Sequence, residues 1–249
     1  MRIYDTLIVG SGYFATGCVM ARGNSVICEE HQVCDTGFYL PLRSFRYHPY
    51  TPKTREGDRL LEIFQGLSLF SETEQNTHAF EIALCQYLLE TKQEVLLKCR
   101  VIDRKRREDG VFDVTVQTNE GLTHLFAREV LDTVGVPSSK QLTVLFTSEL
   151  FSEDSEKLLA AFAGAGIEPA FYPNRYALHL PVAEGLDENQ IKVEIYRTWK
   201  RLDISAKILY MAPVFFGERM GGGLCDGDYD NPVEAFEAGY RYGKEEMAK

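Results

Sequence analysis

Several features that would assign a protein to a class at once are missing from this chain. Its six cysteines form no CxxC pair, and no spacing of His, Cys and Asp suits a metal ion. No apolar run approaches the roughly 18 residues that a membrane span needs, and no basic segment with an apolar run opens the chain. The sequence therefore predicts no disulfide scaffold, no metal site and no membrane partner.

Positive charge is also scarce. The 249 residues include 27 Lys and Arg against 37 Asp and Glu, a formal net charge of -10 at pH 7. Because such a surface repels phosphate backbones, we expect no nucleic-acid partner. The scattered cysteines fit a reducing compartment, and we expect a cytoplasmic protein. With 45% hydrophobic residues, the chain can build a core for one large domain or two small ones.

A glycine-rich turn stands near the beginning, in the stretch "IVGSGYFATG". The apolar run at residues 6–9 is typical of a strand buried on both faces, as in parallel sheets covered by helices. Small residues at 13–21 predict a helix, and residues 25–28 predict a second strand. This order indicates a compact βαβ unit, and so an α/β fold with a parallel sheet.

Each residue type in the turn has a use if a dinucleotide binds. Gly10 permits the tight turn, Gly12 lets a pyrophosphate approach the backbone, and Ala15 allows close packing of helix on strand. The helix begins at Tyr13 and Phe14, and its first N–H groups favour an anion. A plain strand-to-helix turn remains the alternative.

The unit also needs an acid at the end of its second strand, where a carboxylate accepts hydrogen bonds from ribose hydroxyls. Counting from Gly23 favours Glu30, with Glu29 as the alternative. The helix between Gly12 and Gly23 is about one turn shorter than is usual in such units.

Three later stretches carry a resemblance to a known family. They are "AFEIALCQYLLETKQEVLLKCRVIDRKRREDGVFDVTVQTNEG" at 79–121, "AREVLDTVG" at 127–135 and "LCDGDYDNPVEAFEAGYRYG" at 224–243. With the glycine turn, the chain resembles the FAD-dependent oxidoreductases of the glutathione-reductase-like superfamily, whose members carry two dinucleotide-binding motifs. One departure is Thr133-Val134-Gly135, where that family usually has Ala-Thr-Gly.

The resemblance implies FAD as the cofactor and assigns it several contacts. Val101 would lie near the adenine, and Gly135 where the chain leaves the FAD domain. Gly227 and Asp228 would sit against the ribityl chain and the pyrophosphate, ahead of a helix starting around Pro232. The alternative for Asp228 is a helix N-cap or a turn residue in an acidic loop.

The segment 37–50 is dense in arginines and aromatic residues. In the family this segment wraps the cofactor, so Arg43 or Arg46 would balance phosphate charge. A surface loop with arginines stacked on tyrosines explains the same composition. His48 is either an active-site acid or a loop histidine.

The position of residues 136–219 matches that of the family's substrate domain. We expect a small α+β substrate or cap domain there, mainly antiparallel, with residues 1–135 and 220–249 forming a discontinuous FAD-binding domain. Strand alternation places Arg175 and His179 on one face, where His179 could take a proton from a substrate. A histidine satisfied within a half-buried strand is the alternative. Because the insert is short, the substrate is small, or a homo-oligomer or partner subunit completes the pocket.

These observations predict a FAD-dependent oxidoreductase or dehydrogenase that passes hydride from a small organic substrate to flavin N5. There is no second GxGxxG motif and hence no dedicated NAD(P)H domain. Two alternatives stay open: a non-catalytic accessory flavoprotein subunit of a larger complex, and an NAD-binding reductase.

Overall fold

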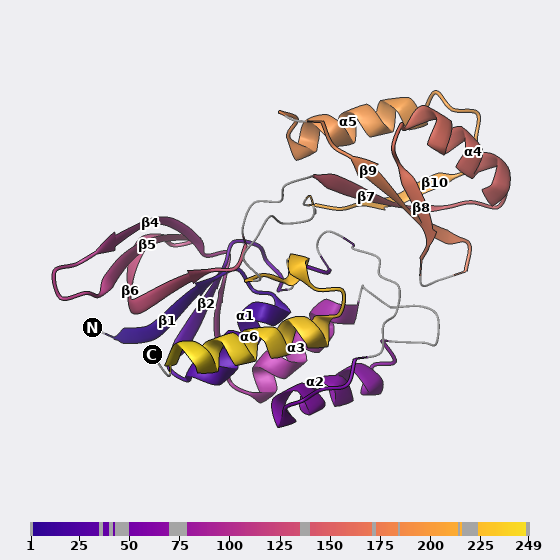
Figure 1. Ribbon diagram of the computed structural model, residues 1–249. Helices are drawn as coiled ribbons and strands as arrows, with labels where there is room; N and C mark the ends of the chain where they lie inside the picture. The colour runs from indigo at the N-terminus through magenta and orange to yellow at the C-terminus, as the bar shows by residue number, and fades with distance from the viewer. Residues whose placement is uncertain are drawn as a thin grey trace.

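A six-stranded sheet forms the centre of the larger part of the molecule (Figure 1). The computed structural model describes residues 2–34, 37–39, 42, 50–69, 79–134, 140–170, 173–183, 185–213, 215 and 224–247. The strands run in the order β3-β2-β1-β6-β5-β4. Their bounds are Ile3–Val9 (β1), Ser25–Glu29 (β2), Glu94–Leu97 (β3), Arg100–Arg106 (β4), Phe112–Thr118 (β5) and Gly121–Asp132 (β6). The pairs β2–β3, β1–β2 and β1–β6 are parallel, so the predicted α/β fold with a parallel sheet is confirmed.

Helices cover one face of this sheet, and its own antiparallel strands fold over the other (Figure 1). Ile8 and Ile27 point into a core shared with the helices. Leu7 and Val26, one residue earlier on each strand, pack instead with Val114 of β5 and its neighbours, because side chains alternate along a strand. The helices are α1 (Tyr13–Arg22), α2 (Arg55–Gly66), α3 (Phe80–Glu90) and α6 (Pro232–Met247).

Helices α1 and α6 pack backbone to backbone although they are far apart in the sequence. A Cβ added at Gly17 would lie 2.0 Å from the Phe236 carbonyl oxygen, and one at Gly239 would lie 2.0 Å from that of Phe14. The Cys18 thiol donates to the Gly239 carbonyl at 3.3 Å. The small residues of α1 thus allow its close contact with α6. The predicted start of the last helix at Pro232 is confirmed.

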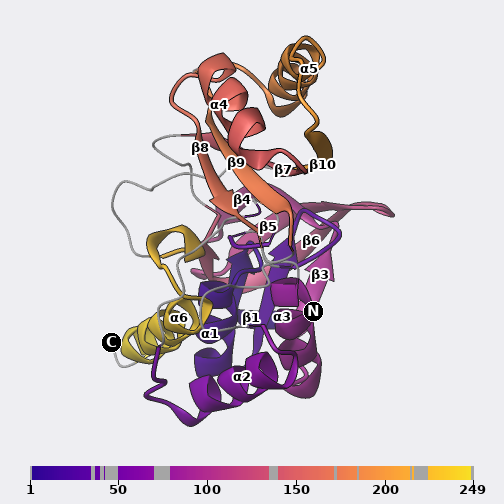
Figure 2. The same cartoon turned by 90° about the vertical axis from the view of Figure 1, so that its right-hand side faces the viewer.

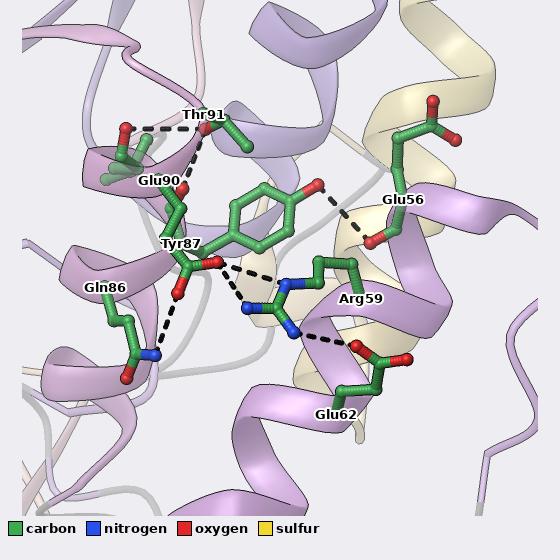
Figure 3. Close-up of polar contacts among 8 residues, drawn as sticks. Glu56, Arg59, Glu62, Gln86, Tyr87, Glu90 and Thr91 are labelled. Carbon is green, nitrogen blue, oxygen red and sulfur yellow. Dashed lines mark hydrogen bonds and ion pairs between the residues drawn. The ribbon is translucent and has the colours of Figure 1, made fainter.

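Helices α2 and α3 are joined at the surface by polar contacts (Figure 3). Arg59 donates from Nε and Nη2 to Glu90 Oε2, at 3.1 and 2.7 Å, and from Nη1 to Glu62 at 2.8 Å. Tyr87 donates to the Glu56 carbonyl at 3.3 Å. Because exposed ion pairs contribute about 0–1 kcal/mol each, the buried faces of these helices supply most of their stability.

A four-stranded antiparallel sheet forms a second unit, in the order β10-β7-β9-β8. Tyr176, Leu178 and Leu180 pack into the core of this unit with Trp199, as the predicted alternation requires. Helices α4 and α5 lie on the side of this sheet that is turned away from the six-stranded sheet (Figures 1 and 2). The bounds are Gln141–Thr147 (β7), Gly166–Pro169 (β8), Arg175–Pro181 (β9), Lys207–Met211 (β10), Phe151–Ala161 (α4) and Glu188–Trp199 (α5). The domain limits at 135/136 and 219/220 stay a prediction. None of the described helices is both long and apolar enough to cross a bilayer.

Candidate dinucleotide-binding site

The glycine turn lies at the carboxyl end of β1, where ligands bind in open α/β sheets. Gly10 has φ +92°, a left-handed backbone that favours glycine, and its N–H donates to the Cys28 carbonyl at 2.9 Å. Thr133, the residue after strand β6, stabilises the turn, because its hydroxyl donates to the Val9 carbonyl at 2.8 Å. The turn has the backbone that the motif predicts.

Glu29 reaches back from the end of β2 to this turn. Its side chain is buried, and Oε2 accepts from the Ser11 backbone N–H at 2.9 Å and from the Ser11 hydroxyl at 2.7 Å. Glu30, which the spacing favoured, is exposed and lies 3.5 Å from the Arg100 Nε. Of the two acids, Glu29 is therefore the one held at the turn. Ser11 is not among the residues predicted for the site, although its place between Gly10 and Gly12 was a sign of its role.

The other oxygen of Glu29 holds His31. Oε1 accepts from the His31 backbone N–H at 2.8 Å and lies 2.7 Å from His31 Nδ1. Burial by itself would raise the pKa of Glu29, but hydrogen bonds from His31 and Ser11 outweigh it and lower that pKa. The same hydrogen bond raises the pKa of His31. The carboxylate is thus kept ionised beside the turn.

A second carboxylate, Asp226, occupies the amino end of α1. Its Oδ2 accepts from the Tyr13 N–H at 2.9 Å and its Oδ1 from the Phe14 N–H at 2.7 Å. The side chain is 4% exposed, and a Cβ added at Gly12 would lie 2.2 Å from Oδ2. The space that Gly12 leaves open is therefore filled by a side chain from the far end of the sequence.

Asp226 lies in a short 3-10 turn, Asp226–Asp228, just before α6. Asp228 is the acid predicted from the same acidic run, but it is exposed and its Oδ2 accepts from the Cys225 thiol at 3.4 Å. Gly227 is half-buried between the two. The repeated acids at 226, 228 and 230 gave no sign of which one turns inward. The contacts predicted for Gly227 and Asp228 stay predictions.

Tyr13 and Phe14 present backbone N–H groups to this place, while their side chains point into the core. The Tyr13 hydroxyl donates to the Phe80 carbonyl at 2.7 Å, and the Phe14 ring stacks on Tyr229 with centroids 6.1 Å apart. Ala15 is fully buried in the same core. These three residues therefore fix the direction of the helix that carries the anion-binding amides.

A small cavity opens beside the turn. It has a volume of about 250 Å³ and is lined by Val9, Val101, Ile102, Asp103, Arg104 and Asp132. Val101, predicted to lie near the adenine, thus borders a hollow at the carboxyl ends of β1 and β6. The predicted contact itself stays a prediction.

His179 and Arg175 lie in the other unit, on strand β9. His179 Nδ1 is 3.0 Å from the Thr143 hydroxyl of the adjacent strand β7, and burial lowers the pKa of His179. Arg175 is exposed at the start of the strand, opposite Thr147. Helices α4 and α5 cover the opposite face, which holds Tyr176 and Leu178. The strand thus places both predicted residues on the face that looks toward the six-stranded sheet.

Four residues proposed from the sequence lie outside the described residues. They are Arg43, Arg46, His48 and Gly135. Their roles stay predictions.

Comparison with solved structures found similar folds. Over 95% of this chain and 76% of the other, it matches a p-nitrophenol 4-monooxygenase from Pseudomonas putida with a TM-score of 0.56 and 14% identity. Over 98% of this chain and 77% of the other, it matches a flavoprotein/dehydrogenase from Cytophaga hutchinsonii with a TM-score of 0.54 and 13% identity. Over 99% of this chain and 63% of the other, it matches an anhydrotetracycline hydroxylase from Streptomyces rimosus with a TM-score of 0.58 and 14% identity. No protein-family model and no curated protein sequence matches the chain.

These comparisons show that the chain has a Rossmann-like fold that solved flavoproteins share. At 13–14% identity they show the fold alone. About a third of the Streptomyces hydroxylase has no counterpart here. The narrower assignment to the glutathione-reductase-like superfamily stays a prediction.

Proposed function

From this shared fold and the glycine turn, we propose that the chain is a FAD-dependent oxidoreductase acting on a small organic molecule. The observation that carries the proposal is the pair of α1 amides, Tyr13 and Phe14, which hold a carboxylate beside Gly12. Two N–H groups that bind one anion are suited to another, and a dinucleotide offers its pyrophosphate at this position. The donor set therefore fits the cofactor, provided that Asp226 moves away.

The residues around the turn suggest how this chain would hold FAD. The Tyr13 and Phe14 amides would bind the pyrophosphate, and the ionised Glu29 would accept from ribose hydroxyls once Ser11 yields one of its contacts. The cavity beside Val101, whose lining combines Val9 and Ile102 with charged side chains, would take the adenine. FAD, when bound, would supply the hydride-accepting N5 position.

In the second unit, His179 would receive the proton that the substrate loses. Its lowered pKa keeps the imidazole neutral near neutral pH, which is the form of a base. If Nδ1–H donates to Thr143, the lone pair that accepts the proton lies on Nε2. Arg175, on the same face of β9, would attract an anionic group of the substrate.

The C-terminal segment favours FAD over NAD. An ordinary NAD-binding domain completes its site without its last thirty residues, whereas here Asp226 and α6 both contact α1. One observation favours the accessory-subunit alternative: Asp226 binds the two amides that we propose for the pyrophosphate. The compared proteins include hydroxylating enzymes and a dehydrogenase, so hydride transfer remains our choice among the reactions this fold carries.

The test is an absorption spectrum of the freshly purified protein, repeated on the supernatant after heat denaturation. We expect flavin bands, or stoichiometric uptake of added FAD by protein purified without it. The same titration with NAD is the matched comparison and should give no binding. A colourless protein that takes up NAD and not FAD would overturn the proposal in favour of a reductase of the ordinary Rossmann type.

A further inference from the structure

The place where the pyrophosphate would bind already holds a ligand, and that ligand belongs to the chain. Asp226 accepts from both Tyr13 and Phe14, so a phosphate oxygen and this carboxylate cannot use the two amides together. Glu29 in turn takes the Ser11 amide. All three of these N–H groups of the turn are therefore bound to carboxylates of the protein itself.

The Asp226 side chain is held between two glycines. A Cβ at Gly12 would lie 2.2 Å from Asp226 Oδ2, and a Cβ at Gly37 would lie 2.2 Å from Asp226 Cβ. Backbone without side chains thus packs against it on two sides, which leaves little room for rotation in place. Asp226 can therefore leave the amides only if the 3-10 turn that carries it moves as well.

Electrostatic repulsion, like the limited room, prevents Asp226 and a pyrophosphate from occupying the site together. The pyrophosphate of FAD carries negative charge, and a carboxylate in the same low-dielectric site would repel it. The N-terminal end of α1 stabilises one anion at a time, whichever ligand brings it. The two ligands therefore compete for one site.

We propose that Asp226 is an internal competitor of the cofactor, so that FAD binds at the α1 amides only when the turn 224–228 is displaced. This rests on the proposed function, because it concerns the regulation of that same site. In the protein without cofactor, the Asp226 carboxylate blocks the two α1 amides. Cofactor loading then opens the turn that leads into α6.

The first experiment measures FAD affinity by quenching of flavin fluorescence, and ADP affinity by calorimetry, for wild type and three variants. Asp226→Ala removes the competitor. We expect its Kd for FAD to fall by about tenfold, because FAD no longer has to displace the carboxylate before it binds. Asp226→Asn keeps the volume but leaves one acceptor oxygen, and should give a smaller gain. Asp230→Asn, an exposed acid four residues away, removes the same charge and should leave the Kd unchanged.

The outcomes separate the two proposals. Wild type that binds FAD as tightly as Asp226→Ala, or more tightly, overturns the competition and leaves the flavin function standing. Failure of every protein to bind FAD or ADP overturns both. Melting temperatures check folding: Asp226→Ala should melt lower than wild type without FAD, because two amides lose their acceptor. If that variant does not fold, Asp226→Asn decides.

A second measurement follows the turn directly in wild type. The Asp228 N–H donates to the Cys225 carbonyl at 3.2 Å, and the Tyr229 N–H to the Asp226 carbonyl at 3.1 Å. Displacement breaks these bonds, so saturating FAD should speed hydrogen exchange at Asp228 and Tyr229 while it slows exchange at Tyr13 and Phe14. Slower exchange at all four amides would mean that the turn stays in place beside the cofactor, and would overturn the inference.

Discussion

At the scale of single residues, the pair formed by Glu29 and His31 makes stability depend on pH. The pKa of Glu29 is lowered in the folded chain, so its contribution is present above its ordinary pKa of 4.5 and is lost as the pH falls through the lowered value. The pKa of His31 is raised, so its contribution is full below 6.5 and is lost as the pH rises through the raised value. The two contributions overlap in the weakly acidic range.

We predict that His31→Gln removes the part of the stability loss that begins as the pH rises beyond 6.5. The imidazolium no longer pairs with the buried Glu29 carboxylate in this variant, so no proton is released from position 31 over that range. Urea unfolding at a series of pH values measures the effect. The same slope of stability against pH in wild type and variant would contradict it.

Residue identities at the turn were only partly predictable. The glycine spacing identified Gly10 and Gly12, because few other residues allow that backbone and that approach. The choice between Glu29 and Glu30 depends on where β2 ends, to one residue, which sets the direction of each side chain. Asp226 could not be selected over Asp228, because the inward side of a 3-10 turn depends on contacts with Gly12 and Gly37.

At the scale of elements, the contact between α1 and α6 depends on glycines that face a backbone. We predict that Gly17→Ala destabilises the protein by about 1–3 kcal/mol, because its Cβ would lie 2.0 Å from the Phe236 carbonyl oxygen and must force the helices apart. Gly66→Ala is the control, at the end of α2, where the added Cβ would have no atom of another described element within 4 Å. It should be neutral or slightly stabilising. Equal melting temperatures for the two variants would contradict this account.

Most elements around the sheet could be predicted from local patterns. The strand–turn–helix–strand order at 6–28 and the helix start at Pro232 needed only apolar runs, glycines and proline. The partner of α1's small residues could not be predicted locally, since α6 lies more than two hundred residues away. The stretch "IKVEIYRTW" forms helix α5, where the Asp187 capping box fixes its start.

At the scale of the whole molecule, the two sheets have separate cores. Trp199, the only tryptophan, is buried in the core of the four-stranded sheet, where its Nε1 donates to the Ala206 carbonyl at 3.0 Å. Its fluorescence therefore reports on that unit. We predict that Leu158→Ala, in the same core, lowers the stability seen by tryptophan fluorescence by about 2–5 kcal/mol.

Leu60→Ala is the matched change in the helix-covered core of the six-stranded sheet. This variant should lower the midpoint of the unfolding transition seen by far-ultraviolet circular dichroism. The midpoint seen by tryptophan fluorescence should stay nearly unchanged. This pair tests the predicted division at 136–219. A single transition, shifted equally by both variants with both probes, would show one cooperative unit.

The packing of α6 on α1 also bears on how the chain is made. Helix α1 is synthesised about two hundred residues before α6, so its face around Gly17 is covered only when residues 232–247 have also been synthesised. Until then, that face is open to chaperones and to other nascent chains. Helix α1 therefore reaches its final packing only after all of the chain between it and α6 has been made.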